Sequence, residues 1–256
     1  MTKNQVHLNT TPRAVTLKNL QMLRLPGMAA AYSQQFDNPD YAKLTFDDRI
    51  GIIVKEEIEQ RTIKRKQRRL KESGIREGDP ANINEMIYSS ERGLDEALVK
   101  ELAECSWITC ERPSNLLVAG ASGTGKTWLI KALGKCACEK ELTVAYYRMI
   151  DLAEKLAELR SEHNVRAFTQ RLQKKKLLII DDFAMGDSPC KALSTDLLRI
   201  IDSRQGVAST IVAAQRNWME WHSWINDPAT ADAIMDRLLN YSYMIELKGR
   251  SLRELK

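Results

Sequence analysis

The fold can be derived from twelve consecutive residues, Leu116-Leu117-Val118-Ala119-Gly120-Ala121-Ser122-Gly123-Thr124-Gly125-Lys126-Thr127. Its first four residues predict a short buried strand, and the next eight match G-x-x-x-x-G-K-T, the phosphate-binding loop of nucleotide-hydrolysing proteins. The glycines let the backbone curl so that successive N–H groups point at phosphate oxygens, where side chains would block the approach. The sequence therefore predicts a nucleotide phosphate site. A glycine-rich turn in an ordinary α/β domain is the alternative.

Each polar group of this loop has an expected task. Lys126 is expected to reach the β- and γ-phosphates, and the Thr127 hydroxyl to hold a magnesium ion. A helix from about Thr127 to Cys138 would aim its positive N-terminal end at the same anion. The expected cofactors are therefore ATP and Mg²⁺. The expected nucleotide-binding residues are Gly120, Ala121, Ser122, Gly123, Thr124, Gly125, Lys126, Thr127 and Trp128.

A second motif supplies the carboxylates that such a site needs. Four apolar residues, Leu177 to Ile180, predict a buried strand that ends in Asp181 and Asp182. We expect Asp181 in the magnesium shell and Asp182 to polarise the attacking water. Many motor ATPases carry glutamate at this second place, so the shorter aspartate predicts slow or partner-dependent hydrolysis. The alternative is that Asp182 caps the following loop.

From residue 94 onward, helical segments alternate with short apolar strands, which is typical of a parallel sheet. A strand between the loop strand and the carboxylate strand, at 144–147, favours the AAA+ and RecA-like branch over GTPases and most small-molecule kinases. Ser188-Pro189 and Asp227-Pro228 predict helix starts with proline at the first position. The expected fold is α/β, a three-layer P-loop domain with a five-stranded parallel sheet. The expected strands are 116–119, 144–147, 177–180, 210–213 and 243–247.

Two further polar residues are candidates for the chemistry of hydrolysis. Gln215 follows the strand at 210–213, where such ATPases carry a polar sensor of the γ-phosphate; a solvated loop glutamine is the alternative. Arg237 ends a helix before the last strand. An arginine presented to a neighbouring subunit's γ-phosphate can stabilise transition-state charge, whereas a surface ion pair is the plainer interpretation.

The N-terminal third predicts helices. Apolar residues recur at helical spacing on both sides of Pro26-Gly27, and a second helix is expected to begin at Thr45, capped by its hydroxyl with Asp48 at the third position. We expect a helical partner- or DNA-binding domain over 1–78, a connector over 79–93 and an ATPase domain over 94–256.

The end of that second helix is densely basic. Seven of the eleven residues from 61 to 71 are Lys or Arg and none is acidic. Such a run indicates contact with a phosphate backbone, and a solvated helix face is the alternative. The expected DNA-binding residues are Arg61, Lys64, Arg65, Lys66, Arg68, Arg69 and Lys71.

Composition sets the remaining bounds. The chain has 256 residues, of which 43% are hydrophobic and 29% charged, with a net charge of +5. No apolar stretch approaches the roughly 18 residues that span a bilayer, and no signal peptide is evident, so we expect a cytoplasmic protein without a membrane partner. Five cysteines, an odd number, argue against a disulfide framework, and no histidine has zinc-ligand spacing to them.

Taken together, these residues resemble the IstB-type helper ATPases of insertion-sequence transposition, relatives of the DnaC helicase loaders in the AAA+ superfamily. The resemblance covers nearly the whole chain. The stretches 23–28 and 247–253 distinguish this family from other AAA+ proteins, which share the motifs of the phosphate site. The stretches that carry it are 23–28, 44–46, 107–108, 120–127, 178–183, 198–204, 232–238 and 247–253.

The resemblance implies ATP-dependent self-assembly on double-stranded target DNA, delivery of that DNA to the transposase of the same element, and stimulation of strand transfer. It implies that Arg237 acts in trans as an arginine finger and that Arg253 is a second sensor at the nucleotide. Only nine residues follow Leu247, so we expect no C-terminal helical lid. A nucleotide without a lid would be covered by a neighbouring subunit or the N-terminal module, which favours a homo-oligomer.

Three functions remain open on the sequence. The first is the transposition regulator, and the second is a DnaC-like loader of a replicative helicase. The third, of another class, is a small-molecule P-loop kinase, which the extra strand and the basic helix disfavour.

Overall fold

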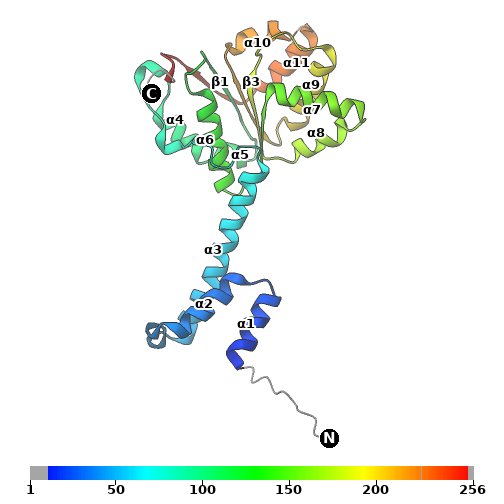
Figure 1. The fold of residues 1–256 in the computed structure, drawn as a ribbon. Helices are drawn as coiled ribbons and strands as arrows, with labels where there is room; N and C mark the ends of the chain where they lie inside the picture. Colours follow the sequence, from blue (N-terminus) through cyan, green and yellow to red (C-terminus); the bar gives the residue numbers. More distant parts are fainter. Residues whose placement is uncertain (1–10, 226, 253–256) are drawn as a thin grey trace. The chain divides into compact units, whose positions relative to one another are not determined.

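The computed structural model describes residues 11–225 and 227–252 (Figure 1). The chain divides into two compact units, Met1–Arg65 and Lys66–Lys256, and the division falls inside one long helix. This boundary lies before the expected connector at 79–93, because residues of that segment pack on the second unit. Lys131 Nζ lies 2.8 Å from Asp79 Oδ2, and Trp128 Nε1 donates to Asn82 O.

The first unit is helical, as expected. Thr45 caps the long helix α3, since its Oγ1 accepts from Asp48 N at 3.2 Å and donates to Asp48 Oδ2 at 2.6 Å. Pro26 occupies the first position of its helix, where its missing N–H costs nothing. The elements are α1 (Pro12–Met22), α2 (Pro26–Asp37), the 3-10 helix η1 (Pro39–Lys43) and α3 (Phe46–Glu72), which continues into the second unit.

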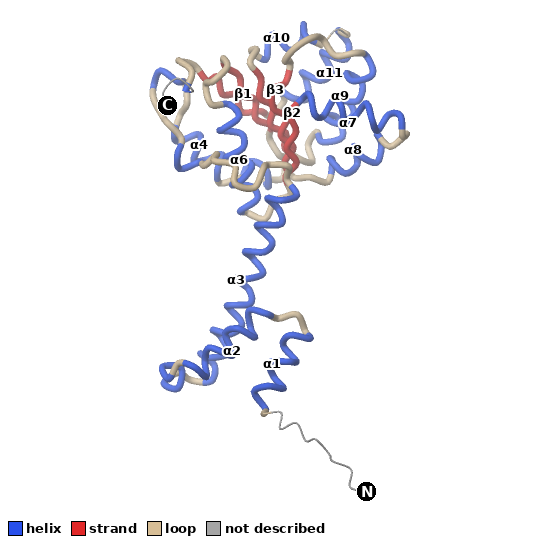
Figure 2. The backbone as a smooth tube through the Cα atoms, in the orientation of Figure 1, coloured by secondary structure: helices blue, strands red, loops and turns tan. Residues whose placement is uncertain are grey.

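The second unit is built on a five-stranded parallel sheet with the order β2-β3-β4-β1-β5 (Figure 2). All five expected strands are confirmed. The strands are β1 (Asn115–Gly120), β2 (Val144–Arg148), β3 (Leu177–Phe183), β4 (Ser209–Ala214) and β5 (Ser242–Leu247). The helices are η2 (Ile83–Glu85), η3 (Ser90–Arg92), α4 (Glu96–Ala103), α5 (Ser106–Thr109), α6 (Lys126–Glu139), α7 (Met149–Ser161), α8 (Val165–Gln173), α9 (Lys191–Arg204), α10 (Trp218–Trp224) and α11 (Pro228–Leu239).

Two apolar cores lie on the two faces of this sheet, so the domain has three layers (Figure 1). Alternate residues of each strand enter opposite cores: Ile179 faces α4 to α6, whereas Ile180 faces α7 to α11. Both isoleucines are fully buried, as expected for parallel strands covered on both sides.

One helix start differs from the expectations. In the sheet, β4 lies between β1 and β3, and β2 lies at the edge, because sequence order does not set spatial order in a doubly wound sheet. Asp227 caps α11 as expected, accepting from Thr230 N. The expectation for Ser188-Pro189 was wrong, since α9 begins two residues later, at Lys191.

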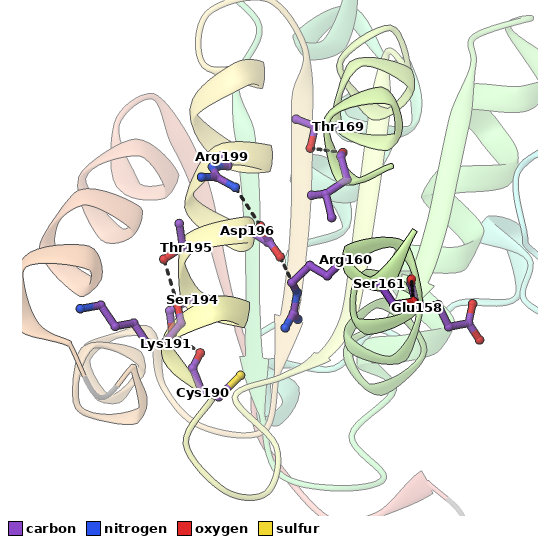
Figure 3. A network of polar contacts seen from close by, with 11 residues as sticks. Glu158, Arg160, Ser161, Thr169, Cys190, Lys191, Ser194, Thr195, Asp196 and Arg199 are labelled. Atoms are coloured by element: carbon purple, nitrogen blue, oxygen red, sulfur yellow. Dashed lines mark hydrogen bonds and ion pairs between the residues drawn. The ribbon is translucent and has the colours of Figure 1, made fainter. Parts of the chain in front are cut away.

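A buried carboxylate joins two helices on the α7 to α11 side. Asp196 of α9 is 3% exposed and lies 2.9 Å from Arg160 Nε of α7 and 3.2 Å from Arg199 Nη1 of its own helix (Figure 3). Two guanidinium groups offset the cost of burying one carboxylate. These ion pairs join α7 to α9 on the face of the sheet opposite to α6. Among the described residues, no helix is long and apolar enough to cross a membrane.

Candidate nucleotide-binding site

The phosphate loop joins the end of β1 to the start of α6 and follows the backbone path that its glycines allow. Gly120, Gly123 and Gly125 all have positive φ, of 150°, 82° and 96°. A Cβ on Gly120 would lie 2.3 Å from Leu247 O at the end of β5. Glycine is therefore required there by the neighbouring strand as well as by the phosphate approach.

Lys126 is the first residue of α6, and its side chain turns back over the loop. The residue is 6% exposed, and its ammonium donates to Gly120 O at 2.7 Å and to Ala121 O at 2.9 Å. This holds the cation inside the loop, where phosphate oxygens are the partners that an ammonium prefers.

The metal-holding pair expected from the sequence comes together at the carboxyl edge of the sheet. Asp181, at the end of β3, is 1% exposed and accepts hydrogen bonds from the Thr127 hydroxyl and from Tyr146 Oη at 2.9 Å. Burial raises the pKa of Asp181, although these two hydrogen bonds act in the opposite direction. A buried carboxylate beside a hydroxyl is an oxygen donor set that suits Mg²⁺.

Asp182 lies in a distorted part of β3. The register with β4 shifts between Ile180 and Phe183, and Asp182 has φ of +55°, a conformation that non-glycine residues adopt only at a cost. Bulges next to functional sites re-aim side chains. Here the Asp182 carboxylate lies 3.6 Å from Arg148 Nε at the end of β2, and its N–H donates to Asp181 Oδ1.

Two segments outside the motif pack on the loop. The guanidinium of Arg92 is buried and donates to Thr124 O at 2.8 Å and to Ile87 O. Burial lowers the pKa of Arg92. Beyond β5, Leu252 N donates to Gly123 O at 2.9 Å. Residues 248–252 thus run along the loop, and no lid helix follows β5 within this described stretch.

The other expected nucleotide contacts are placed less directly. Trp128 donates its indole N–H to Asn82 O, which turns the ring toward the segment before α4. Gln215 follows β4 at the carboxyl edge, and its amide contacts the sulfur of Met185 at 3.8 Å. Arg253, the expected second sensor, lies outside the described residues.

Arg237 lies at the opposite edge of the sheet. Its main-chain oxygen accepts from Asn115 at the start of β1, whereas the phosphate loop follows the end of that strand. Its guanidinium lies 2.6 Å from Asp202 and also donates to Ala233 O. The structure therefore does not bring Arg237 to the phosphate site of its own chain, and a role at a neighbour's site stays a prediction.

The seven basic residues of α3 differ in their contacts. Arg61 donates to Glu57 at 2.7 Å, Arg65 to Thr62 Oγ1 at 3.1 Å and Arg69 to Glu141 O at 3.1 Å. Arg68 lies 3.8 Å from Glu72. Arg69 is half-buried, and the other six side chains are exposed: Arg61, Lys64, Arg65, Lys66, Arg68 and Lys71.

Three residues at the site were not predicted from the sequence: Arg92, Tyr146 and Arg148. Arg148 could have been predicted, because it follows a predicted strand and so reaches the same edge of the sheet as Asp181. In the structure the two residues are paired across β2 and β3. Nothing local marks Arg92 or Tyr146, whose partners lie 32 and 35 residues away.

The sheet order, the glycine loop and the carboxylates at the end of β3 define a P-loop protein of the AAA+ class. Solved structures with this fold include the DnaC helicase loader, with a TM-score of 0.54 and 16% identity over 66% of this chain and 97% of that one. AMPPCP-bound DnaA from Aquifex aeolicus gives a TM-score of 0.55 and 21% identity over 66% of this chain and 50% of that one.

The chain belongs to the family of IstB-like ATP binding proteins, whose model matches residues 18–256. It is 36% identical to the insertion sequence ATP-binding protein y4pL of Sinorhizobium fredii, over 93% of this chain and 95% of that protein. It is also 36% identical to the ATP-binding protein of insertion sequence IS1162 from Pseudomonas fluorescens, over 78% of this chain and 85% of that protein. The predicted family is thus confirmed, and with it an ATP-binding, transposition-associated role.

Proposed function

We propose that this protein is an ATPase that assembles on double-stranded target DNA in its ATP-bound form and recruits and stimulates the transposase of its element. The observation that carries the proposal is the meeting of Lys126, Thr127 and Asp181 at one edge of the sheet, in a chain of the IstB-like family. The same geometry supports binding of ATP with Mg²⁺.

Each residue has a distinct task in this proposal. The loop N–H groups and Lys126 bind the β- and γ-phosphates, and Thr127 with Asp181 holds Mg²⁺, which neutralises charge on the phosphates when bound. Asp182 orients the attacking water and accepts its proton. Arg237 of one subunit reaches the γ-phosphate of the next, which makes hydrolysis depend on assembly.

The basic face of α3 supplies the proposed contact with DNA. Lys64, Arg68 and Lys71 recur at spacings of three and four residues, which places them on one side of the helix. Phosphate contacts of this kind are independent of base sequence and weaken steeply with salt.

The test is particle mass on duplex and on single-stranded oligonucleotides, each with ATP, ADP or no nucleotide. We expect large assemblies on duplex DNA only with ATP, and none for Lys126→Ala. Lys140→Ala, which changes an exposed lysine at the far end of α6, is the control and keeps assembly. Unchanged assembly of Lys126→Ala would refute the proposal. Small protein–DNA complexes that form preferentially on single-stranded DNA would favour a helicase loader. Phosphoryl transfer from ATP to a metabolite would favour a small-molecule kinase.

A further inference from the structure

The main chain that leaves α3 is hydrogen-bonded to the edge strand beside the nucleotide site. Ser73 O accepts from Tyr146 N of β2 at 2.7 Å. The next residue, Gly74, has φ of +81°, and a Cβ there would lie 2.8 Å from Tyr146 O. Because β2 is an edge strand, its outer main-chain groups need partners from outside the sheet. The end of α3 supplies one of them.

The side chain of the same tyrosine reaches the metal-holding carboxylate. Tyr146 pairs with Ile179 of β3, so its ring shares a face with Asp181 two residues further along. Its hydroxyl donates to Asp181 Oδ2 at 2.9 Å. Burial and the nearby carboxylates raise the pKa of Tyr146, which keeps the hydroxyl protonated as a donor. One residue therefore contacts the end of α3 through its backbone and Asp181 through its side chain.

The segment Ser73–Asp79, which we name the α3 exit segment, also packs on the helix that follows the phosphate loop. Ile75 is buried, and a Cβ on Gly134 of α6 would lie 2.7 Å from its Cδ1. Asp79 Oδ2 lies 2.8 Å from Lys131 Nζ, and Lys131 Nζ in turn lies 5.2 Å from the ring centre of Tyr146. A shift of this segment would displace its packing partners on both α6 and β2, since close-packed interiors transmit displacements.

We propose that Tyr146 is a positioning residue for Asp181 that couples this carboxylate to α3, so that double-stranded DNA bound on α3 changes the Mg²⁺-dependent affinity for nucleotide. The coupling rests on the proposed function, because it requires DNA to contact the basic face of α3. Linkage makes it reciprocal: nucleotide with Mg²⁺ must change the affinity for DNA by the same factor.

The positioning role is tested without DNA. Tyr146→Phe removes the hydroxyl and keeps the ring, and binding of a fluorescent ATP analogue is measured with Mg²⁺ and with a chelator. We expect about a tenfold loss of affinity with Mg²⁺, the effect of one hydrogen bond to a charged group, and no change with the chelator. The control is Tyr147→Phe. The ring of Tyr147 lies in the other core, with its centre 6.0 Å from the ring centre of Phe168. Nucleotide binding by this variant should match that of the wild type both with Mg²⁺ and with the chelator.

The coupling is tested by repeating the titration with a saturating duplex. Wild type and Tyr147→Phe should change their Mg²⁺-dependent affinity with DNA, and Tyr146→Phe should not. A second pair perturbs the backbone joint instead. Gly74→Ala places a methyl group against Tyr146 O and should also abolish the DNA effect. Gly78 has a similar positive φ, of +79°, but nothing lies within 4 Å of a Cβ there, so Gly78→Ala should retain the DNA effect.

The outcomes separate this proposal from the proposed function. Equal Mg²⁺-dependent affinity of Tyr146→Phe and wild type would overturn the positioning role. A DNA effect that survives both Tyr146→Phe and Gly74→Ala, in variants with wild-type melting curves, would overturn the coupling. A wild-type protein that binds no DNA would refute the proposed function and the coupling with it, whereas the DNA-free titration would still decide the positioning role.

Discussion

The carboxylate of Glu57 lies over the amino terminus of α2, with Oε2 2.7 Å from Gly27 N and 3.1 Å from Met28 N. Glu57 is 6% exposed and receives a third hydrogen bond from Arg61. Free N–H groups and the helix dipole favour an anion at this end of a helix. A residue 30 positions away thus completes the first turn of α2. This contact explains the stretch Leu25-Pro26-Gly27-Met28, in which proline starts the helix and glycine leaves room for Glu57.

Loss of this charge should destabilise the first unit in a pH-dependent way. Burial raises the pKa of Glu57, but the hydrogen bonds from Arg61, Met28 and Gly27 outweigh it and hold the pKa below the ordinary value of a glutamate. The carboxylate therefore stabilises the fold fully above that ordinary value, and the contribution disappears as pH falls through the lower folded pKa. Glu57→Gln should cost about 1–3 kcal/mol at pH 7.

Hydrogen exchange of the α2 amides in the full chain measures this cost. The difference from wild type should shrink in acid. Glu59→Gln, an exposed neighbour on the same helix, should leave exchange unchanged, and an equal effect of both variants would contradict the assignment.

The close approach of α2 and α3 predicts opposite effects for two glycines. A Cβ on Gly27 would lie 2.7 Å from Glu57 Cα, so Gly27→Ala should destabilise the first unit by about 1–3 kcal/mol. Gly51, on α3, has nothing within 4 Å of a Cβ, and Gly51→Ala should stabilise the helix by up to about 1 kcal/mol. Denaturant unfolding of both variants checks the signs; stabilisation by Gly27→Ala would show that the helices are not in contact there.

Substitution of Asp181 should affect nucleotide binding, whereas substitution of Asp182 should affect hydrolysis. Asp181→Asn should lower Mg²⁺-dependent nucleotide binding, because the metal loses a charged ligand. Asp182→Asn should keep binding and lower hydrolysis by roughly 10²- to 10⁴-fold. Nucleotide titrations and phosphate release measure the two effects separately. Asp196→Asn, a buried aspartate away from the site, should lower stability but not hydrolysis per folded molecule. Full activity of Asp182→Asn would assign that residue to the loop alone.

The exposed basic residues of α3 should determine the salt dependence of DNA binding. Replacing Lys64, Arg68 and Lys71 together with Gln should reduce the slope of log affinity against log salt by about 2 to 3. Binding to duplex is measured over a range of salt concentrations. The control replaces three exposed lysines elsewhere, Lys18, Lys155 and Lys191, and removes the same charge. An equal change in both triple variants would mean that net charge, and not this face, binds DNA.

Arg237 should act on a neighbouring subunit. Arg237→Ala is expected to bind ATP normally and to lose hydrolysis in the assembled state. Mixing it with Asp182→Asn, which keeps ATP binding, should restore part of the activity, because one chain then supplies the arginine and the other the intact hydrolytic site. Asp202→Asn, which removes the ion-pair partner of Arg237 but keeps the arginine, serves as the control. No recovery on mixing would contradict action in trans.

Much of the site could be predicted because its signals are local. The glycine spacing of 120–127, the apolar run before Asp181 and the cap at Thr45 each depend on neighbouring residues, and the structure has all three. The start of α9 was predicted wrongly because Ser188-Pro189 satisfies the local rule for a helix start, whereas Cys190 is still extended and α9 begins at Lys191. The spatial order of the strands has no such local signal, because strand adjacency depends on how the crossovers pack.

The phosphate loop, the strands and the family can therefore be derived from the order of residues along the chain. Four relationships appear only in the folded protein: the hydrogen bond from Tyr146 to Asp181, the cap of Glu57 on α2, the positive φ of Asp182 and the place of Arg237 at the far edge. Loop conformation and strand burial follow from nearby side chains, whereas these relationships join residues that are distant in the chain and meet only when the sheet and its helices have packed.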